Sequence, residues 1–254
     1  MKDIVNEENV NFRVGVLSTI DSPLLPFFLE SILGQKMKNI VVICDSKKIA
    51  SKDKKIFFER TGGEFERFDD RNSNIYQVGN AMIPFYFVKN HNDEQTLNLI
   101  NSLSLDVLLN AGTPRKLKKH ILEGTKHGVV NIHPGILPHY RGCSAVEWAL
   151  FNNDKVGNTA HFMTKGYDEG NIILSEWYNF PSDANYKSIR VRVYRESITL
   201  AGKTLRLIFE KKIIPTDGVP QDHNLAKYWD PIPDEKFAQV VEFVNNGRYK
   251  YQKH

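Results

Sequence analysis

The run NIVVIC at residues 39–44 is the clearest indication of this chain's fold class. It is short, apolar and rich in β-branched residues, which is typical of a strand buried on both faces of a parallel sheet. A similar run covers residues 12–17. The stretch between them has Pro23 and Pro26 near its start and Gly34 near its end, the positions that these residues prefer in a helix. We therefore expect a strand, a helix and a second strand.

The same alternation continues along the chain. Further β-rich runs are predicted at residues 83–88, 105–109, 129–132, 158–164 and 172–178. Helical patterns are predicted at residues 46–60, 93–103, 144–152, 182–210 and 237–245, with a short helix after Pro114. Strands that alternate with helices are joined by right-handed crossovers and form a parallel sheet. The sequence thus predicts an α/β, Rossmann-like fold with an open, mostly parallel sheet.

The domain organisation follows from changes in texture along the chain. Residues 1–10 are polar and are expected to form a flexible tail, and residues 11–212 are expected to form the main domain. Beyond Pro215 the pattern changes to PTDGVP and YWDPIPDE before the last helix. We interpret residues 213–254 as a small C-terminal extension and a candidate dimerisation element.

Composition restricts the classes of function. Hydrophobic residues make up 41% and charged residues 25% of the 254-residue chain, as in ordinary globular proteins, and 34 basic residues against 30 acidic ones give a net charge of +4. Cys44 and Cys143 are not in a Cys-x-x-Cys spacing, and the histidines show no ligand spacing, so we predict neither a disulfide framework nor a metal site. The N-terminal stretch has no apolar signal region. We predict a cytoplasmic protein without nucleic-acid or membrane partners.

The densest chemical signal is NIHPGILPHYRG at residues 131–142, where an apolar run turns into a loop rich in turn residues. Asn131 and His133 are alternate residues of an extended segment, so their side chains project to the same side. They stand at the carboxyl end of a strand, the edge at which open α/β sheets bind ligands.

A second signal is GYDEG at residues 166–170, a glycine-bracketed loop between two β-rich runs. Asp168 alone would be an ordinary turn residue. A loop between strands can bring its carboxylate back to His133. An amide, an imidazole and a carboxylate together suit a reaction that builds and then collapses a tetrahedral carbon.

As a pair, these motifs resemble the catalytic core of the formyltetrahydrofolate-dependent formyltransferases, well over roughly residues 80–180 and loosely before that. The resemblance implies that Asn131, His133 and Asp168 are catalytic, that N10-formyltetrahydrofolate is the donor and co-substrate, and that residues 11–212 are the catalytic domain. Asn131 and His133 would then stabilise the oxyanion, with one such donor worth about 2.7–4 kcal/mol of barrier. Asp168 would accept the proton of the attacking amine, directly or through one water.

The resemblance also implies binding residues. The segment DVLLNAGTP at residues 106–114 resembles the family's stretch whose backbone borders the pterin, and the loop at residues 166–170 would close the other side. The expected donor-binding residues are Leu109, Ala111, Gly112, Thr113, Gly166, Tyr167 and Gly170. The expected acceptor-binding residues are His139, Tyr140 and Arg141, with Arg141 pairing either with a phosphate or with a local carboxylate.

The acceptor is inferred from what surrounds the core motifs. The family branch that acts on glycinamide ribonucleotide has a glycine-rich loop after its first strand, whereas VLSTIDS at residues 16–22 has no glycine. The methionyl-tRNA branch carries a basic C-terminal β-barrel, whereas about 40 residues of mixed charge follow Pro215. The deformylase branch usually has an extra domain before the first strand.

The chain resembles most the compact sugar-nucleotide N-formyltransferases, with which the run RGCSAVEWAL at residues 141–150 also agrees. That resemblance implies a 4-amino-4,6-dideoxyhexose linked to GDP, as in GDP-perosamine, or to dTDP, for surface polysaccharide (O-antigen) biosynthesis, and a homodimer. Transfer to methionyl-tRNA or to glycinamide ribonucleotide stays as an alternative. A hypothesis of another class is a folate- or nucleotide-binding protein without turnover.

Overall fold

The computed structural model describes residues 12–65 and 74–253. The tail expected at residues 1–10 lies outside this part. The chain forms two compact units. Of the described residues, the first unit comprises 12–50, 74–131 and 201–217, and the second comprises 51–65, 132–200 and 218–253. Within the described residues, no helix is both long and apolar enough to cross a membrane.

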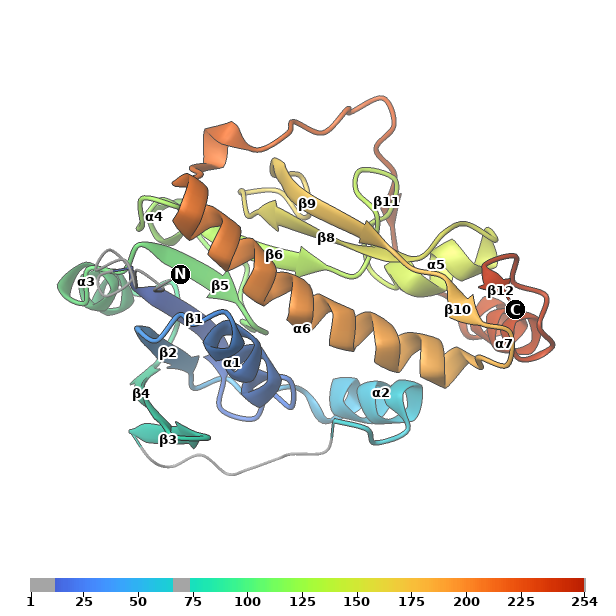
Figure 1. The fold of residues 1–254 in the computed structure, drawn as a ribbon, viewed down its shortest axis with the longest axis horizontal. Helices are drawn as coiled ribbons and strands as arrows, with labels where there is room; N and C mark the ends of the chain where they lie inside the picture. The colour runs from blue at the N-terminus through green and yellow to red at the C-terminus, as the bar shows by residue number, and fades with distance from the viewer. Residues whose placement is uncertain (1–11, 66–73, 254) are drawn as a thin grey trace, which may run out of the picture. The chain divides into compact units, whose positions relative to one another are not determined.

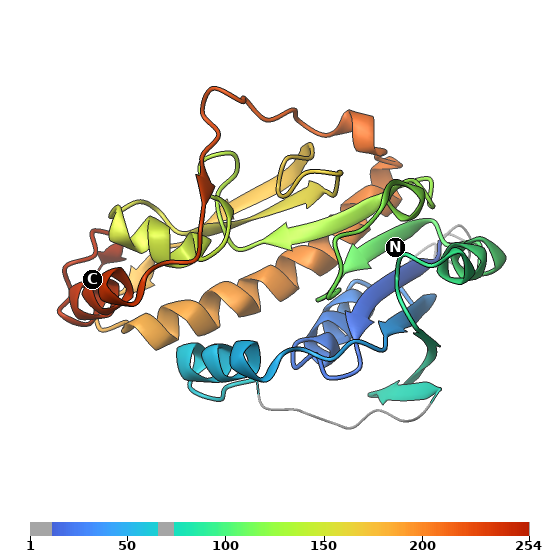
Figure 2. The same cartoon turned by 180° about the vertical axis from the view of Figure 1, so that it is seen from behind.

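The central sheet has eight strands, six of which begin in the first unit (Figures 1 and 2). These are β1 (Val14–Thr19), β2 (Ile40–Asp45), β3 (Ile75–Val78), β4 (Ala81–Val88), β5 (Val107–Asn110) and β6 (Val129–His133), whose last two residues are counted with the second unit. They lie in the order β3-β4-β2-β1-β5-β6, and only β3 and β4 pair antiparallel. The predicted α/β fold with a mostly parallel sheet is confirmed.

Packing explains why the first unit's strands and helices form where they do. β2 contains all of the NIVVIC run except Asn39, five of its six residues are buried, and β1 beside it is buried throughout. The helices that belong wholly to this unit are α1 (Leu25–Gly34), α3 (Glu94–Ser102) and α4 (Lys119–Leu122). Pro26 stands in the first turn of α1, where its missing amide proton costs no helical hydrogen bond. Because β1, β2 and β5 run parallel, their carboxyl ends share one edge.

The second unit contains the other two strands of the central sheet, β8 (Gly157–Phe162) and β9 (Ile172–Trp177), which pair antiparallel. Two short parallel pairs join β7 (Arg141–Gly142) to β11 (Tyr228–Trp229) and β10 (Phe180–Pro181) to β12 (Gln252–Lys253). The remaining helices are α2 (Ser51–Thr61), α5 (Ala145–Phe151), α6 (Tyr186–Lys211), which runs through both units, and α7 (Asp234–Asn245). These pairs fix how the loop after β6 and the end of the chain run.

The C-terminal segment contributes to the core of the second unit. Ile232, Val240, Val244 and Tyr249 are buried in one cluster with apolar residues of α5 and α6. The Tyr249 hydroxyl accepts a hydrogen bond from the Val156 amide and donates one to a main-chain carbonyl. The role in dimerisation stays a prediction.

Candidate active site

His133 and Asp168 come together in the second unit although 34 residues separate them. His133 is the last residue of β6 and is 4% exposed, and Asp168 stands in the turn between β8 and β9. His133 Nδ1 lies 3.4 Å from Asp168 Oδ1, while His133 Nε2–H donates to the Tyr140 carbonyl over 2.5 Å. The predicted imidazole and carboxylate therefore form one polar pair.

Asp168 is held in place from several sides. Its backbone adopts φ 54°, a left-handed conformation that aspartate tolerates better than most residues and that is common at functional sites. The Gly142 amide donates to its Oδ2 over 2.9 Å, and His161 Nε2 lies 3.5 Å from its Oδ1. Burial raises the pKa of Asp168, but the hydrogen bond and charge of His161, the charge of His133 and the Gly142 amide outweigh burial and lower it to about 2. Asp168 is therefore a carboxylate at neutral pH.

Burial lowers the pKa of His133, and the charge of Asp168 opposes this only in part. The neutral imidazole carries its proton on Nε2, since the Tyr140 carbonyl can only accept. Nδ1, beside Asp168, is then the nitrogen that can take up a proton. For an Nε2–H to reach an oxyanion, as the motif predicts, the ring must release the Tyr140 carbonyl.

Asn131 stands two residues before His133 on β6 and is described with the first unit. The Asn110 side-chain amide donates to Asn131 Oδ1 over 2.9 Å, so the Asn131 NH₂ group lies at the opposite end of its amide. The Asn110 oxygen accepts from the main-chain amides of Gly112 and Thr113. Asn110 therefore orients Asn131, whose NH₂ group is predicted to bond the oxyanion. It also holds the main chain of Gly112 and Thr113, which are predicted to bind the formyl donor.

Arg141 supports the Asp168 loop. It is buried, and its guanidinium donates twice, through Nε and an Nη, to Gln221 Oε1. The Gln221 amide then donates to the carbonyls of Asp168 and Gly170. The sequence left a phosphate or a carboxylate as the partner of Arg141, and the partner is instead a neutral amide. Contact between Arg141 and the acceptor stays a prediction, which this buried position does not favour.

Sequence reasoning missed three residues of this site: Asn110, His161 and Gln221. His161 lies on β8, seven residues before Asp168, and its position in the strand that leads into the loop was the available signal. Asn110 ends the strand next to the one that carries Asn131 and could have been found in the same way. Gln221 is 53 residues from Asp168 and had no local signal.

The predicted donor-binding residues fall into two groups, one in each unit. In the first unit the Leu109 side chain is buried, so only its main chain could meet a ligand, while Gly112 is exposed with φ 99°. In the second unit Tyr167 is 52% exposed. A side chain at Gly170 would collide with the Phe162 carbonyl. Gly112 is therefore required by its positive φ, and Gly170 by the lack of space for a side chain.

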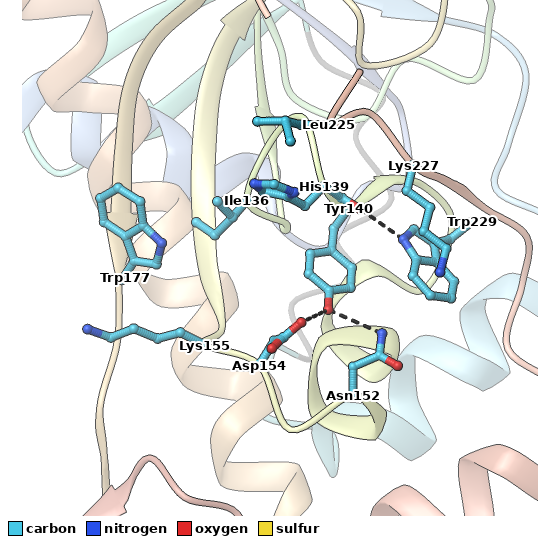
Figure 3. Close-up of a pocket in the computed structure, with 10 residues that line it drawn as sticks. All are labelled: Ile136, His139, Tyr140, Asn152, Asp154, Lys155, Trp177, Leu225, Lys227 and Trp229. Atoms are coloured by element: carbon cyan, nitrogen blue, oxygen red, sulfur yellow. Dashed lines mark hydrogen bonds between the residues drawn. The ribbon is translucent and has the colours of Figure 1, made fainter. Parts of the chain in front are cut away.

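His139 and Tyr140, predicted to bind the acceptor, line a pocket of 550 Å³ in the second unit (Figure 3). The Tyr140 hydroxyl donates to Asp154 at 2.5 Å, and the Tyr140 ring stacks on Trp229. Further lining residues are Ile136, Asn152, Lys155, Trp177, Leu225 and Lys227. The pocket is thus lined by two lysines and by the half-exposed indole of Trp177. Tyr140 also lines it, and its main-chain carbonyl accepts the hydrogen bond of the His133 ring.

The model of the formyl transferase family matches residues 29–197, which is more than half of the chain. The chain belongs to the formyl transferase family. Both motifs, with Asn131, His133 and Asp168, lie inside the matched region of this formyl transferase.

Proteins similar to this chain carry the names of different formyltransferases. A methionyl-tRNA formyltransferase from Alkaliphilus oremlandii is 30% identical over 147 residues, 58% of this chain and 46% of that protein. The chain spans about half the length, or less, of the curated relatives that it matches. Two solved structures share the fold. Glycinamide ribonucleotide transformylase 1 from Symbiobacterium toebii has a TM-score of 0.57 at 21% identity, covering 83% of this chain and 93% of its own. A sugar N-formyltransferase from Shewanella sp FDAARGOS_354 has a TM-score of 0.58 at 15% identity, and the match covers 87% of this chain and 77% of that one.

Metal ligands do not gather in the part of this family member that the structure describes. Among residues 12–65 and 74–253, no group of three or more His, Cys, Asp and Glu side chains could hold an ion. The prediction that no metal takes part stays a prediction.

Proposed function

We propose that the protein transfers a formyl group from N10-formyltetrahydrofolate to the amino group of a nucleotide-linked 4-amino-4,6-dideoxyhexose. The observation that carries the reaction type is the buried His133–Asp168 pair within the matched family region. At neutral pH the pair is an ionised carboxylate beside a neutral imidazole, so both groups are unprotonated where they face each other and the pair has a site for the proton of the attacking amine.

The proposed chemistry assigns a step to each residue. The acceptor amine attacks the formyl carbon, a C–N bond forms, and the carbonyl electrons move to the oxygen, where the Asn131 NH₂ group stabilises them. The amine gives up a proton to the His133–Asp168 pair, directly or through one water. The C–N10 bond then breaks, and the same proton goes to N10, so the pair ends as it began.

One observation supports a sugar nucleotide as the acceptor. It is the pocket beside Tyr140, where Lys155 and Lys227 provide cations for a diphosphate and Trp177 provides a ring on which a base can stack. Three of its lining residues lie in the loop that follows His133, and the Tyr140 carbonyl bonds the His133 ring, which would join acceptor binding to the reacting centre.

Transfer to methionyl-tRNA is the second candidate, because several curated relatives at about 30% identity carry that name. Glycinamide ribonucleotide is less favoured. Residues 16–22, at the end of β1 and just after it, have no glycine to approach a phosphate closely.

The acceptor is tested by incubating the protein with N10-formyltetrahydrofolate and, in separate reactions, GDP-, dTDP- and UDP-linked 4-amino sugars, methionyl-tRNA and glycinamide ribonucleotide. We expect a mass gain of one formyl group on a 4-amino sugar nucleotide alone. Formylation of methionyl-tRNA alone would overturn the acceptor but keep the reaction. Donor binding without transfer to any acceptor would favour a binding protein.

A further inference from the structure

A layer of polar contacts at the carboxyl edge of the first unit's sheet takes no part in the chemistry above. Asp45 is the last residue of β2 and is fully buried. Arg115, from the segment after β5, reaches it with two bonds of 2.9 Å, from Nε to Oδ2 and from an Nη to Oδ1. Because β1 lies between β2 and β5, this bridge spans the end of a whole strand. Bidentate pairs of this kind fix geometry as well as charge.

His91 joins the same carboxylate to the start of the segment. Its main-chain amide donates to Asp45 Oδ2 over 2.9 Å, and its Nε2–H donates to the Ile43 carbonyl over 2.9 Å. Nδ1 is then the accepting nitrogen, so the Thr113 hydroxyl, 2.6 Å away, donates to it. Burial lowers the pKa of His91, which favours the neutral ring that this arrangement requires.

Asn92 fixes the rest of the segment. Its side-chain NH₂ donates to the Lys116 carbonyl over 3.0 Å, and its Oδ1 accepts from the Lys118 amide over 2.7 Å. His120 Nε2 donates to the Asn92 carbonyl. One asparagine side chain therefore sets the path of the main chain across residues 116–118.

The segment held in this way continues directly from the residues expected to border the pterin. We propose that Asp45, His91 and Asn92 are positioning residues for the formyl donor: they hold the main chain of residues 113–118 and thereby fix the adjoining end of the segment expected to border the pterin. This inference rests on the proposed function. Recognition by main-chain groups depends on backbone conformation alone, so residues that touch no ligand can set the affinity.

The test uses Asn92→Ala, which removes both side-chain bonds to the segment, with Asn101→Ala on the exposed face of α3 as the matched control. Binding of tetrahydrofolate is measured by calorimetry without acceptor. We expect Asn92→Ala to raise Kd about tenfold, which corresponds to about 1.4 kcal/mol. The KM of the acceptor and the melting temperature should stay near those of the control.

Each outcome decides the proposal. Equal tetrahydrofolate binding by wild type and Asn92→Ala would overturn it, as would a parallel loss of acceptor affinity and melting temperature, which would indicate a folding role only. If Asn92→Ala does not fold, Asn92→Asp, which loses only the side-chain bond to the Lys116 carbonyl and keeps the acceptor for the Lys118 amide, takes its place with a smaller expected rise in Kd. Absence of folate binding in the wild type would overturn the proposed function itself, and this inference with it.

Discussion

At the scale of single residues, the site depends on where protons can reside. Asp168 stays ionised because the hydrogen bonds of His161 and the Gly142 amide favour its charge, although burial opposes it. His133 stays neutral because burial prevails over the attraction of Asp168. The pair therefore consists of an ionised carboxylate and a neutral imidazole. Neither group is protonated where it faces the other, so the pair can take up a proton from the amine.

Removing either member of the pair should abolish transfer without abolishing donor binding. We expect Asp168→Asn and His133→Ala each to reduce kcat by 10²-fold or more, roughly the contribution of general-base catalysis. Binding of tetrahydrofolate should change only a few-fold. The measurement is single-turnover transfer together with calorimetric binding, and near-normal turnover in either variant would refute the assigned roles.

Asp168 should also contribute to stability in a pH-dependent way. Its folded pKa of about 2 lies below the value of about 3.9 typical of unfolded chains, so its contribution is complete above about pH 4 and is lost as the pH falls towards 2. We expect the free energy of unfolding of the wild type to fall more steeply across this window than that of Asp168→Asn. Urea unfolding at a series of pH values measures this, and parallel curves would contradict it.

At the scale of elements, two very short strands determine where the Gly142 amide lies, which donates a hydrogen bond to Asp168. β7 and β11 pair over two residues each, and Gly142 of β7 has φ 88°. A Cβ at this position would lie 2.5 Å from the Trp229 carbonyl. The pairing of β7 with β11 and the amide bond to Asp168 thus depend on the same glycine.

Gly142→Ala should therefore damage both stability and turnover. We expect a loss of roughly 1–3 kcal/mol, from the positive φ and the collision with Trp229, and a clear fall in kcat. Gly247→Ala is the matched control, because Gly247 also has positive φ, at 67°, but a Cβ there would meet nothing within 4 Å. Thermal unfolding and kcat are compared, and equal effects of the two variants would contradict the role given to Gly142.

The elements that the sequence predicted are those with a strong local pattern. The β-branched runs at β2 and β6 and the amphipathic pattern of α6 produced strands and a helix close to the expected positions. The two-residue pairs of β7, β10, β11 and β12 were missed, because two residues carry no periodicity. Gln221 was missed for a related reason, since its bonds reach 53 residues along the chain.

At the scale of the whole molecule, each unit has its own core, and the end of the chain belongs to the second. Tyr249 is 1% exposed and bonds through its hydroxyl to main-chain groups on either side of Lys155. The change of texture after Pro215 predicts a small extension, but it does not reveal what that segment packs against. The structure shows that Val240 and Val244 of the last helix are buried.

Tyr249→Ala should thus destabilise the second unit strongly. We expect a loss of about 3–5 kcal/mol in the free energy of unfolding, as for other large aromatic side chains removed from a core. Val219→Ala, at a position 65% exposed, serves as the control and should change stability by less than about 0.5 kcal/mol. Chemical denaturation compares the two variants. Similar small losses in the free energy of unfolding would show that Tyr249 contributes little to the core of the second unit.

Formyl transfer by the His133–Asp168 pair can be followed by single-turnover transfer of a ¹³C-labelled formyl group from N10-formyltetrahydrofolate. With an amino sugar nucleotide as acceptor, the wild type should release one tetrahydrofolate for each labelled formamide formed. Asp168→Asn should bind the donor and form neither product. Release of free formate by the wild type, or labelled formamide at the wild-type rate from Asp168→Asn, would contradict the account.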